Sequence, residues 1–219
     1  WNKSSFNPLL LLYDKAVNDL KVTPSGKGII FGTETDPFLK EREIYLLEVN
    51  KSNICNQLST ESTFLEKGFS YTNAISFCKV NTNNFYINDT TAKQVKKFSL
   101  DESKRALTSK SVFLELNDSI GFPDGLVCDT KGNIWISFWF EGCVRHYSSQ
   151  GEILFRIPFP NQNIASVALT AEGHLVVNPS TFEWDEAKEI TPKFYLKGQS
   201  KQSSVFVVQF YKAFSFGRP

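Results

Sequence analysis

Three oxygen-bearing side chains stand at the starts of short predicted strands, spaced roughly 50 residues apart. They are Asn18, Asn73 and Asp124. One carboxylate and two amides offer hard oxygen ligands, which divalent cations prefer and Ca²⁺ above all. The alternative is that these side chains only hydrogen-bond to water and to neighbouring turns. Spacing alone leaves both interpretations open.

Asp124 lies in the most informative stretch of the chain, residues 121–138. Pro123 fixes φ and Gly125 tolerates φ > 0, so Asp124 is predicted to sit on a stiff turn at the start of a strand. A hairpin turn at 129–133 and a second strand rich in β-branched and aromatic residues follow. Aspartates are common in turns, so the alternative role of Asp124 is a turn cap alone.

The elements that position these side chains repeat along the chain. Each copy has a strand, a small or polar turn and an apolar strand, and the turn residues are Gly26, Asn83, Gly132 and Gly173. Intervals of roughly 40–50 residues are typical of β-propeller blades. In a propeller the strands nearest the axis start at one face, so the three oxygen-bearing side chains are expected to converge there.

A coarse strand assignment follows from this repeat. The expected blades cover 19–49, 63–100, 112–147 and 152–178, with final strands in 204–216. We expect residues 94–100, where lysines alternate with apolar residues, to form a solvent-facing edge strand. Residues 101–111 are expected to be a charged link, and 179–203 a long polar loop. No helical periodicity extends beyond about two turns, so the predicted class is all-β.

Composition limits the class of protein. The chain has 219 residues, of which 41% are hydrophobic and 21% charged, as expected for one globular domain spanning 1–219. The net charge of +1 gives no electrostatic support for nucleic-acid binding. No apolar run reaches the ~18 residues that a membrane span needs, so no membrane partner is expected.

The cysteines and histidines show no recognisable catalytic or metal-binding pattern. No two cysteines form a C-x-x-C pair, which argues against a zinc ribbon or a thioredoxin-like site. Cys78 and Cys128 fall in predicted strands and are expected to be buried thiols. His146, on an outer-type strand, and His174, after a turn glycine, are expected to have surface or turn roles.

Several motifs resemble the senescence-marker-protein/gluconolactonase/luciferin-regenerating-enzyme-like family. Three motifs lie downstream: Phe122-Pro-Asp-Gly-Leu, Asp129-x-x-Gly132-Asn-Ile-Trp135 and Gly142-x-Val-Arg145-x-Tyr. Three lie upstream: Asn18-Asp19-x-Lys21, Tyr71-Thr-Asn73-Ala-Ile75 and Tyr86-Ile-Asn-Asp89-Thr90. Their order and spacing agree with the family from about residue 16 onwards. The resemblance implies a six-bladed β-propeller whose first blade or blades are missing or incomplete in this chain.

The resemblance also implies a function: hydrolysis of a small lactone or sugar-derived ligand with the help of one divalent ion. Ca²⁺ is expected in the first place, with Zn²⁺, Mn²⁺ or Mg²⁺ as alternatives. Asn73 and Asp124 match the family's metal ligands, and Asn18 matches its substrate-contacting Asn. The ion would polarise the ester carbonyl, and Asp124 would act as the catalytic base for the attacking water. The family's first-blade Glu ligand has no counterpart in this sequence.

Departures from the family pattern keep a second function open. The family's Arg is Ala16 here, and two motif glycines are Leu20 and Ala74. These replacements favour a degenerate calcium-binding or ligand-binding propeller without hydrolase activity. Because no signal peptide is evident, a cytoplasmic location is expected rather than a secreted one.

Overall fold

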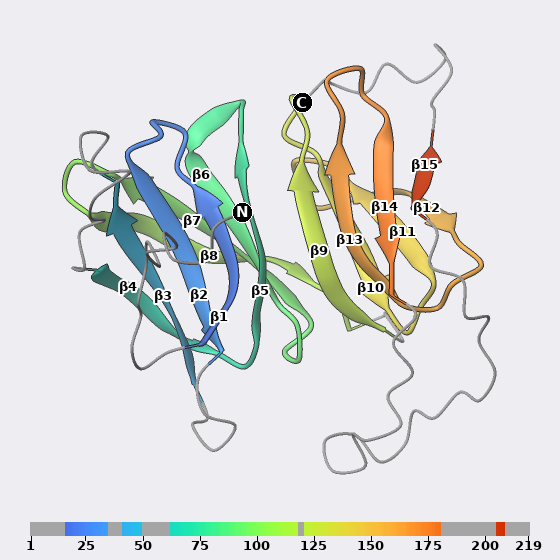
Figure 1. Cartoon of the computed structure of the whole chain (residues 1–219), viewed down its shortest axis with the longest axis horizontal. Helices are drawn as coiled ribbons and strands as arrows, with labels where there is room; N and C mark the ends of the chain where they lie inside the picture. The colour runs from blue at the N-terminus through green and yellow to red at the C-terminus, as the bar shows by residue number, and fades with distance from the viewer. Residues whose placement is uncertain (1–15, 35–40, 50–61, 118–120, 181–204, 209–219) are drawn as a thin grey trace, which may run out of the picture. The chain divides into compact units, whose positions relative to one another are not determined.

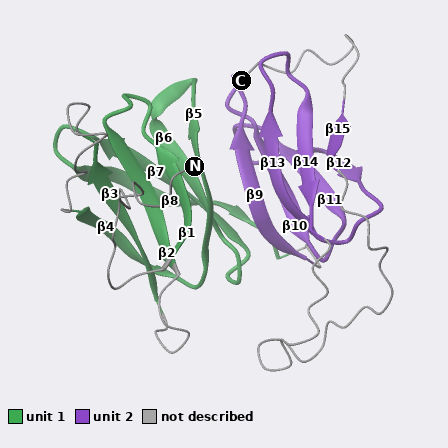
Figure 2. Cartoon of the chain, viewed as in Figure 1, with its two compact units in different colours: residues 1–117 green, residues 118–219 purple. Residues whose placement is uncertain are grey.

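The computed structural model describes residues 16–34, 41–49, 62–117, 121–180 and 205–208, and these residues form β-strands without any helix (Figure 1). The chain divides into two compact units, residues 1–117 and 118–219 (Figure 2). The described part of the chain therefore contains no helix of the length and apolarity that crossing a membrane requires.

The first unit holds two four-stranded antiparallel sheets, in which each strand pairs with the next one along the chain. Its strands are β1 (Ala16–Val22), β2 (Gly28–Glu34), β3 (Arg42–Glu48), β4 (Ser62–Phe69), β5 (Thr72–Cys78), β6 (Asn81–Asp89), β7 (Gln94–Asp101) and β8 (Ala106–Glu115). One sheet has the order β1-β2-β3-β4 and the other β5-β6-β7-β8. A four-stranded meander of this kind is the construction of a propeller blade.

The second unit repeats this construction. Its strands are β9 (Phe122–Cys128), β10 (Ile134–Trp139), β11 (Cys143–Tyr147), β12 (Ile153–Pro158), β13 (Ile164–Leu169), β14 (Leu175–Pro179) and β15 (Phe206–Val208). Strands β9 to β12 form a four-stranded sheet, and β13, β14 and β15 form a three-stranded one within the described residues. The predicted all-β class and its blade-type sheets are confirmed.

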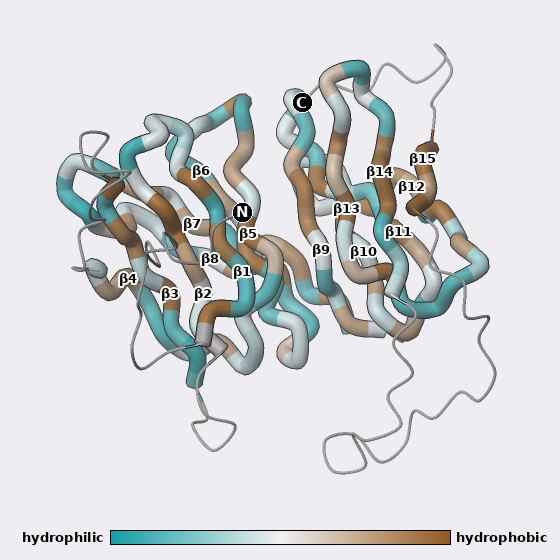
Figure 3. Tube along the Cα trace, in the orientation of Figure 1, coloured by the Kyte–Doolittle hydropathy of each residue, from teal (hydrophilic) through white to brown (hydrophobic). Residues whose placement is uncertain are grey.

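Each unit has its own hydrophobic core. In the first unit the core includes Ile30, Ile44, Ile75, Phe85, Ile87, Phe98 and Leu100. In the second unit it consists of Trp135, Val144, Ile164, Val167, Leu175 and Val177. Figure 3 shows the apolar residues along the strands and polar residues at many hairpin turns. β-branched and aromatic side chains suit such half-buried or fully buried pleated surfaces.

The predicted hairpin turns are confirmed at three of the four repeats. The N–H groups of Gly26, Gly132 and Gly173 donate to the carbonyl oxygens of Thr23, Asp129 and Thr170 at 2.9, 3.1 and 3.0 Å. These glycines have φ of +69°, +84° and +85°, the left-handed region that glycine adopts at little cost. The fourth prediction is wrong, because Asn83 lies inside β6 and the β5–β6 hairpin turns at residues 79–80.

The predicted blade boundaries are wrong by one strand. The sequence assigned β4, β8 and β12 to the link or blade that follows them, whereas each closes the preceding sheet. Strands β8 and β12 are largely exposed and β4 is mostly half-buried, so their burial does not show which sheet each one belongs to. Strand β7 is also not an edge, because β8 pairs with its far side. Residues 181–204 and 209–219, and hence most of the predicted loop and final strands, lie outside the described residues.

The cysteines also differ from expectation. Cys78 and Cys128 are both disulfide-bonded rather than free thiols. Cys143, on β11, is a free and buried thiol, and burial raises its pKa above the ordinary value. Disulfides were not predicted because the spacing of cysteines along the chain does not reveal which of them bond. Cys55 lies outside the described residues.

Candidate functional site

Each predicted site residue lies at a β-bulge in the first strand of its sheet. In β1, Val17 pairs with Thr33 and Asp19 pairs with Gly32, so Asn18 is an extra residue without a partner in the register. A bulge of this kind bends the strand and re-aims a side chain, and bulges are frequent beside active sites. The sequence had suggested that Asn18 lies at the start of a strand. It lies inside β1 instead.

Strands β5 and β9 carry bulges at the equivalent point. In β5, the two residues Asn73 and Ala74 oppose a single residue of β6. In β9, the two residues Asp124 and Gly125 oppose the single residue Ser137 of β10. The three candidate side chains therefore share one structural position in three successive sheets, and all three are half-buried.

The first strand of the fourth sheet, β13, has the same irregularity. Ile164 pairs with Pro179 and Ser166 with Asn178, which leaves Ala165 as the extra residue. An alanine offers no side-chain oxygen. Among the described sheets, three of the four bulges therefore present a polar side chain, and the fourth presents a methyl group.

The bulges of β1 and β5 are joined by side-chain hydrogen bonds. The Asn18 amide Nδ2 donates to the Thr72 carbonyl oxygen at 2.7 Å. The Ile75 backbone N–H donates to the Asp19 carboxylate Oδ2 at 2.6 Å. These two backbone groups flank Asn73 on either side. Asn18 and Asp19, consecutive residues at the β1 bulge, thus hold the β5 bulge at both of its ends.

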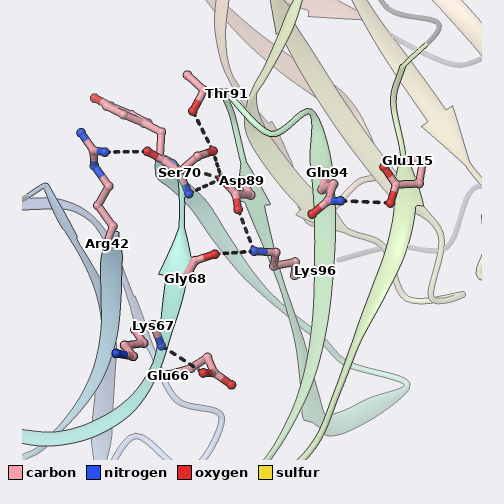
Figure 4. A network of polar contacts seen from close by, with 11 residues as sticks. Arg42, Glu66, Lys67, Gly68, Ser70, Asp89, Thr91, Gln94, Lys96 and Glu115 are labelled. Atoms are coloured by element: carbon pink, nitrogen blue, oxygen red, sulfur yellow. Dashed lines mark hydrogen bonds and ion pairs between the residues drawn. The ribbon is translucent and has the colours of Figure 1, made fainter. Parts of the chain in front are cut away.

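The chain entering the β5 bulge is fixed by the buried carboxylate of Asp89 (Figure 4). Its Oδ1 accepts the backbone N–H of Ser70 at 2.9 Å, the Ser70 hydroxyl at 2.6 Å and the Tyr71 N–H at 3.0 Å. Its Oδ2 accepts the Lys96 ammonium at 2.7 Å. Because these bonds end one residue before β5 begins, they set the direction in which the chain reaches Asn73.

The Asp124 bulge is fixed by a serine and by close packing. The Gly125 N–H donates to the Ser137 Oγ at 2.8 Å. A Cβ placed on Gly125 would lie 2.6 Å from the Ser166 Cα and 2.9 Å from the Val167 nitrogen, both backbone atoms of β13. Glycine is therefore required after Asp124 by the close approach of β13. Ala74, at the matching place in β5, is accommodated and buried.

His146 is buried in the second unit, so its predicted surface role is wrong. Its ring stacks on Trp135 with the centroids 3.9 Å apart, and its Nε2 lies 3.5 Å from the Asp129 Oδ2. Asp129 Oδ1 also accepts the backbone N–H groups of Lys131 and Asn133. Burial acts to raise the pKa of Asp129, but His146 and these N–H donors outweigh it and hold the pKa below its ordinary value.

The oxygen donors at the bulges suit a hard divalent cation in chemical type, since Ca²⁺ takes carboxylate and amide oxygens. The Asn73 Oδ1 accepts the Ala74 N–H at 3.0 Å. Among the described residues, no three or more His, Cys, Asp or Glu side chains cluster as a metal site. The oxygen donors at the bulges are thus amides in the first unit and a carboxylate in the second.

Comparison with known proteins decides the family. The sequence model of the SMP-30/Gluconolactonase/LRE-like region matches residues 2–178. The chain belongs to this family. The resemblance seen in the sequence motifs is therefore confirmed, and the relatives include lactonases.

Curated relatives and solved structures agree with this assignment. The pentonolactonase XacC of Haloferax volcanii is 32% identical over 51% of this chain and 39% of its own length. The regucalcin of Danio rerio is 24% identical over 76% of this chain and 55% of its own. The crystal structure of a calcium-binding regucalcin from Agrobacterium tumefaciens matches with a TM-score of 0.65 and 25% identity, over 81% of this chain and 58% of the other. The chain thus spans less than two thirds of these relatives' length.

Proposed function

We propose that this protein is a metal-dependent lactonase that hydrolyses a small lactone or sugar-derived ester. The observation that carries the proposal is the repeated bulge. Asn18, Asn73 and Asp124 occupy one structural position in three successive sheets. The family membership and the lactonases among the relatives support the reaction class.

Asn73 and Asp124 are proposed to hold one divalent ion, with Ca²⁺ preferred. A divalent ion held there would supply Lewis-acid polarisation of the ester carbonyl. Asp124 accepts the proton of the attacking water, because a carboxylate is the only one of the three groups that can serve as a base. Asn18 binds the substrate through its carbonyl oxygen or through the second N–H of its amide, since the Thr72 carbonyl takes one Nδ2 hydrogen.

The four sheets are proposed to belong to a single six-bladed propeller domain. Support comes from the share of the regucalcin structure that the chain covers, 58%. Four blades of six would make up about two thirds of such a propeller, somewhat more than that share. Consecutive first strands would then bring their bulges to one end of the propeller, as the shared site requires.

A binding propeller without hydrolase activity is the second candidate. The observation that favours it is the loss of family motif residues at Ala16, Leu20 and Ala74. The two candidates share the metal site and differ in whether a bound lactone is cleaved.

Proton release during lactone hydrolysis, measured with and without divalent ions, tests the proposal. Asp124→Asn is expected to abolish hydrolysis and to weaken Ca²⁺ binding, because an amide cannot take the proton. Asn73→Ala is expected mainly to weaken Ca²⁺ binding. Asn83→Ala, an exposed Asn in β6, is the matched control and should change neither. Calorimetric Ca²⁺ binding by the wild-type protein without hydrolysis of any small lactone would leave the binding propeller as the function.

A further inference from the structure

We propose that Asp19 is a positioning residue that fixes the β5 bulge and thereby the direction of the Asn73 side chain. The inference rests on the proposed function for what Asn73 binds. The hydrogen bond at its centre joins the Ile75 N–H to the Asp19 Oδ2 at 2.6 Å, between side chain and backbone 56 residues apart in sequence.

The bulge explains why this bond matters. In β5 the ladder pairs Thr72 with Asp89 and Ile75 with Ile87, and the register shifts between them. Asn73 lies within that shift, outside the regular pairing of the ladder. The Thr72 carbonyl and the Ile75 N–H on either side of it are taken up by Asn18 and Asp19.

Asp19 supplies the stronger of the two bonds. A carboxylate that accepts a backbone N–H makes a charge-assisted hydrogen bond, roughly twice as strong as a neutral one. The Ile75 residue is 2% exposed, so water does not readily replace the carboxylate as an acceptor. Loss of the acceptor leaves a buried donor unsatisfied, which costs about 1–3 kcal/mol in proteins.

The carboxylate is specific to this sheet. At the register position of Asp19, the other three first strands carry Ala74, Gly125 and Ser166. Ala74 and Gly125 have no side-chain hydrogen-bonding group, and a serine hydroxyl carries no charge. A carboxylate at this position is therefore not needed to form a bulge. Asp19 must have another role, and its hydrogen bond to Ile75 indicates that this role concerns the β5 bulge.

Positioning differs from direct metal binding in its chemistry. If Asp19 acts as an acceptor for Ile75, then an amide oxygen at the same place can substitute for it. If it acts as a ligand or through its negative charge, then an amide cannot. Partners that orient a metal ligand typically contribute a factor of about 10–100 to metal affinity.

Calcium calorimetry on four proteins tests the proposal. Asp19→Ala is expected to weaken Ca²⁺ binding by about 10–100-fold, and Asp19→Asn by less than about threefold because it retains the acceptor oxygen. Asp101→Ala removes one carboxylate charge from the end of β7 in the same unit and is expected to match the wild type. Asp19→Ala with wild-type affinity, or Asp19→Asn as weak as Asp19→Ala, would overturn the proposal.

A second measurement does not depend on the metal or on activity. In the metal-free wild-type protein, the Ile75 amide proton is expected to exchange slowly with solvent by NMR, and in Asp19→Asn it stays protected. Rapid exchange of this amide in the folded wild type would overturn the proposal even where Asp19→Ala does not fold. Another outcome is that the wild-type protein binds no Ca²⁺ even though its Ile75 amide is protected. That result refutes the proposed function, and with it the role of Asp19 in positioning Asn73 as a metal ligand. Unchanged affinity in Asp19→Ala refutes the positioning role alone.

Discussion

Gly125 is the residue on which the geometry around Asp124 most directly depends. Gly125→Ala would place a Cβ 2.6 Å from the Ser166 Cα, and backbone atoms cannot move aside cheaply. We expect this variant to lose about 1–3 kcal/mol of unfolding free energy, the usual cost of overpacking. Urea unfolding measures the loss. The control is Ala74→Gly at the matching position, with an expected cost below about 1 kcal/mol. Equal stability of Gly125→Ala and wild type would contradict the close approach of β13.

Asp129 gives the second unit an acid-sensitive element. Its pKa is held below the ordinary 3.8, so its stabilising contribution is complete above that value and is lost as the pH falls through the folded-state pKa. We expect the unfolding free energy of the wild type to decrease between about pH 5 and pH 2. Asp129→Asn should flatten this decrease, and the exposed Glu152→Gln should not. Denaturant titrations at several pH values measure the slopes, and an unchanged slope in Asp129→Asn would refute the assignment.

At the residue scale, local motifs were readable from the sequence and long-range partners were not. Asn73 and Asp124 stand out because each lies within a short contiguous motif. Asp19 lies in a motif as well, but its acceptor role depends on Ile75, which folding brings near from another strand. His146 was expected at the surface because of the charged Arg145 beside it. Arg145 is itself buried and paired with Glu141 at 2.7 Å, so charge did not indicate exposure.

The turn that leads into β5 is stabilised by one buried ion pair. Lys96→Met removes the ammonium from Asp89, whose side chain is 1% exposed, and leaves the carboxylate without this counter-charge. We expect a loss of at least about 2 kcal/mol of unfolding free energy, since breaking a buried pair is costly. The control is Lys110→Met, which breaks the more exposed pair with Glu66 in the same unit and should cost less than about 1 kcal/mol. Equal losses by chemical denaturation would contradict this ranking.

At the element scale, inner strands were predictable and outer strands were not. Strands β5 and β10 are mostly buried and rich in apolar side chains, so their hydrophobic runs are visible in the sequence. The outer strands β8 and β12 expose most of their residues, and the sequence does not show which neighbouring sheet each one joins. Their strand state comes from backbone pairing with the preceding strand, which composition does not encode.

At the scale of the whole molecule, the proposed site takes one ligand from each compact unit, Asn73 from the first and Asp124 from the second. A ligand that binds only the folded state stabilises it, by about 2.7 kcal/mol at 100 times its Kd. We therefore expect saturating Ca²⁺ to slow hydrogen exchange in peptides that cover β5 and also in peptides that cover β9. In Asp124→Asn both effects should shrink. Protection confined to one unit would show that the ion does not draw ligands from both.

The fold class was predictable from the sequence because strand, turn and strand recur at intervals that only a repeated β architecture produces. The bulges were not predictable, because an extra residue in one strand is defined only by its pairing partner. Because the bulges could not be seen in the sequence, Asn18 and Asp124 were expected at strand starts. Both lie inside strands.

The repeated bulge has an evolutionary consequence. Each sheet contributes one side chain at the same structural position, and the bulge itself is maintained by backbone pairing and by neighbouring residues. Ala165 occupies that position in the fourth sheet and bears no polar atom. A single substitution there, such as Ala165→Asp, would add a fourth oxygen-bearing side chain at a bulge that already exists. A scaffold of this kind can acquire or lose a ligand, and with it a substrate preference, one point mutation at a time.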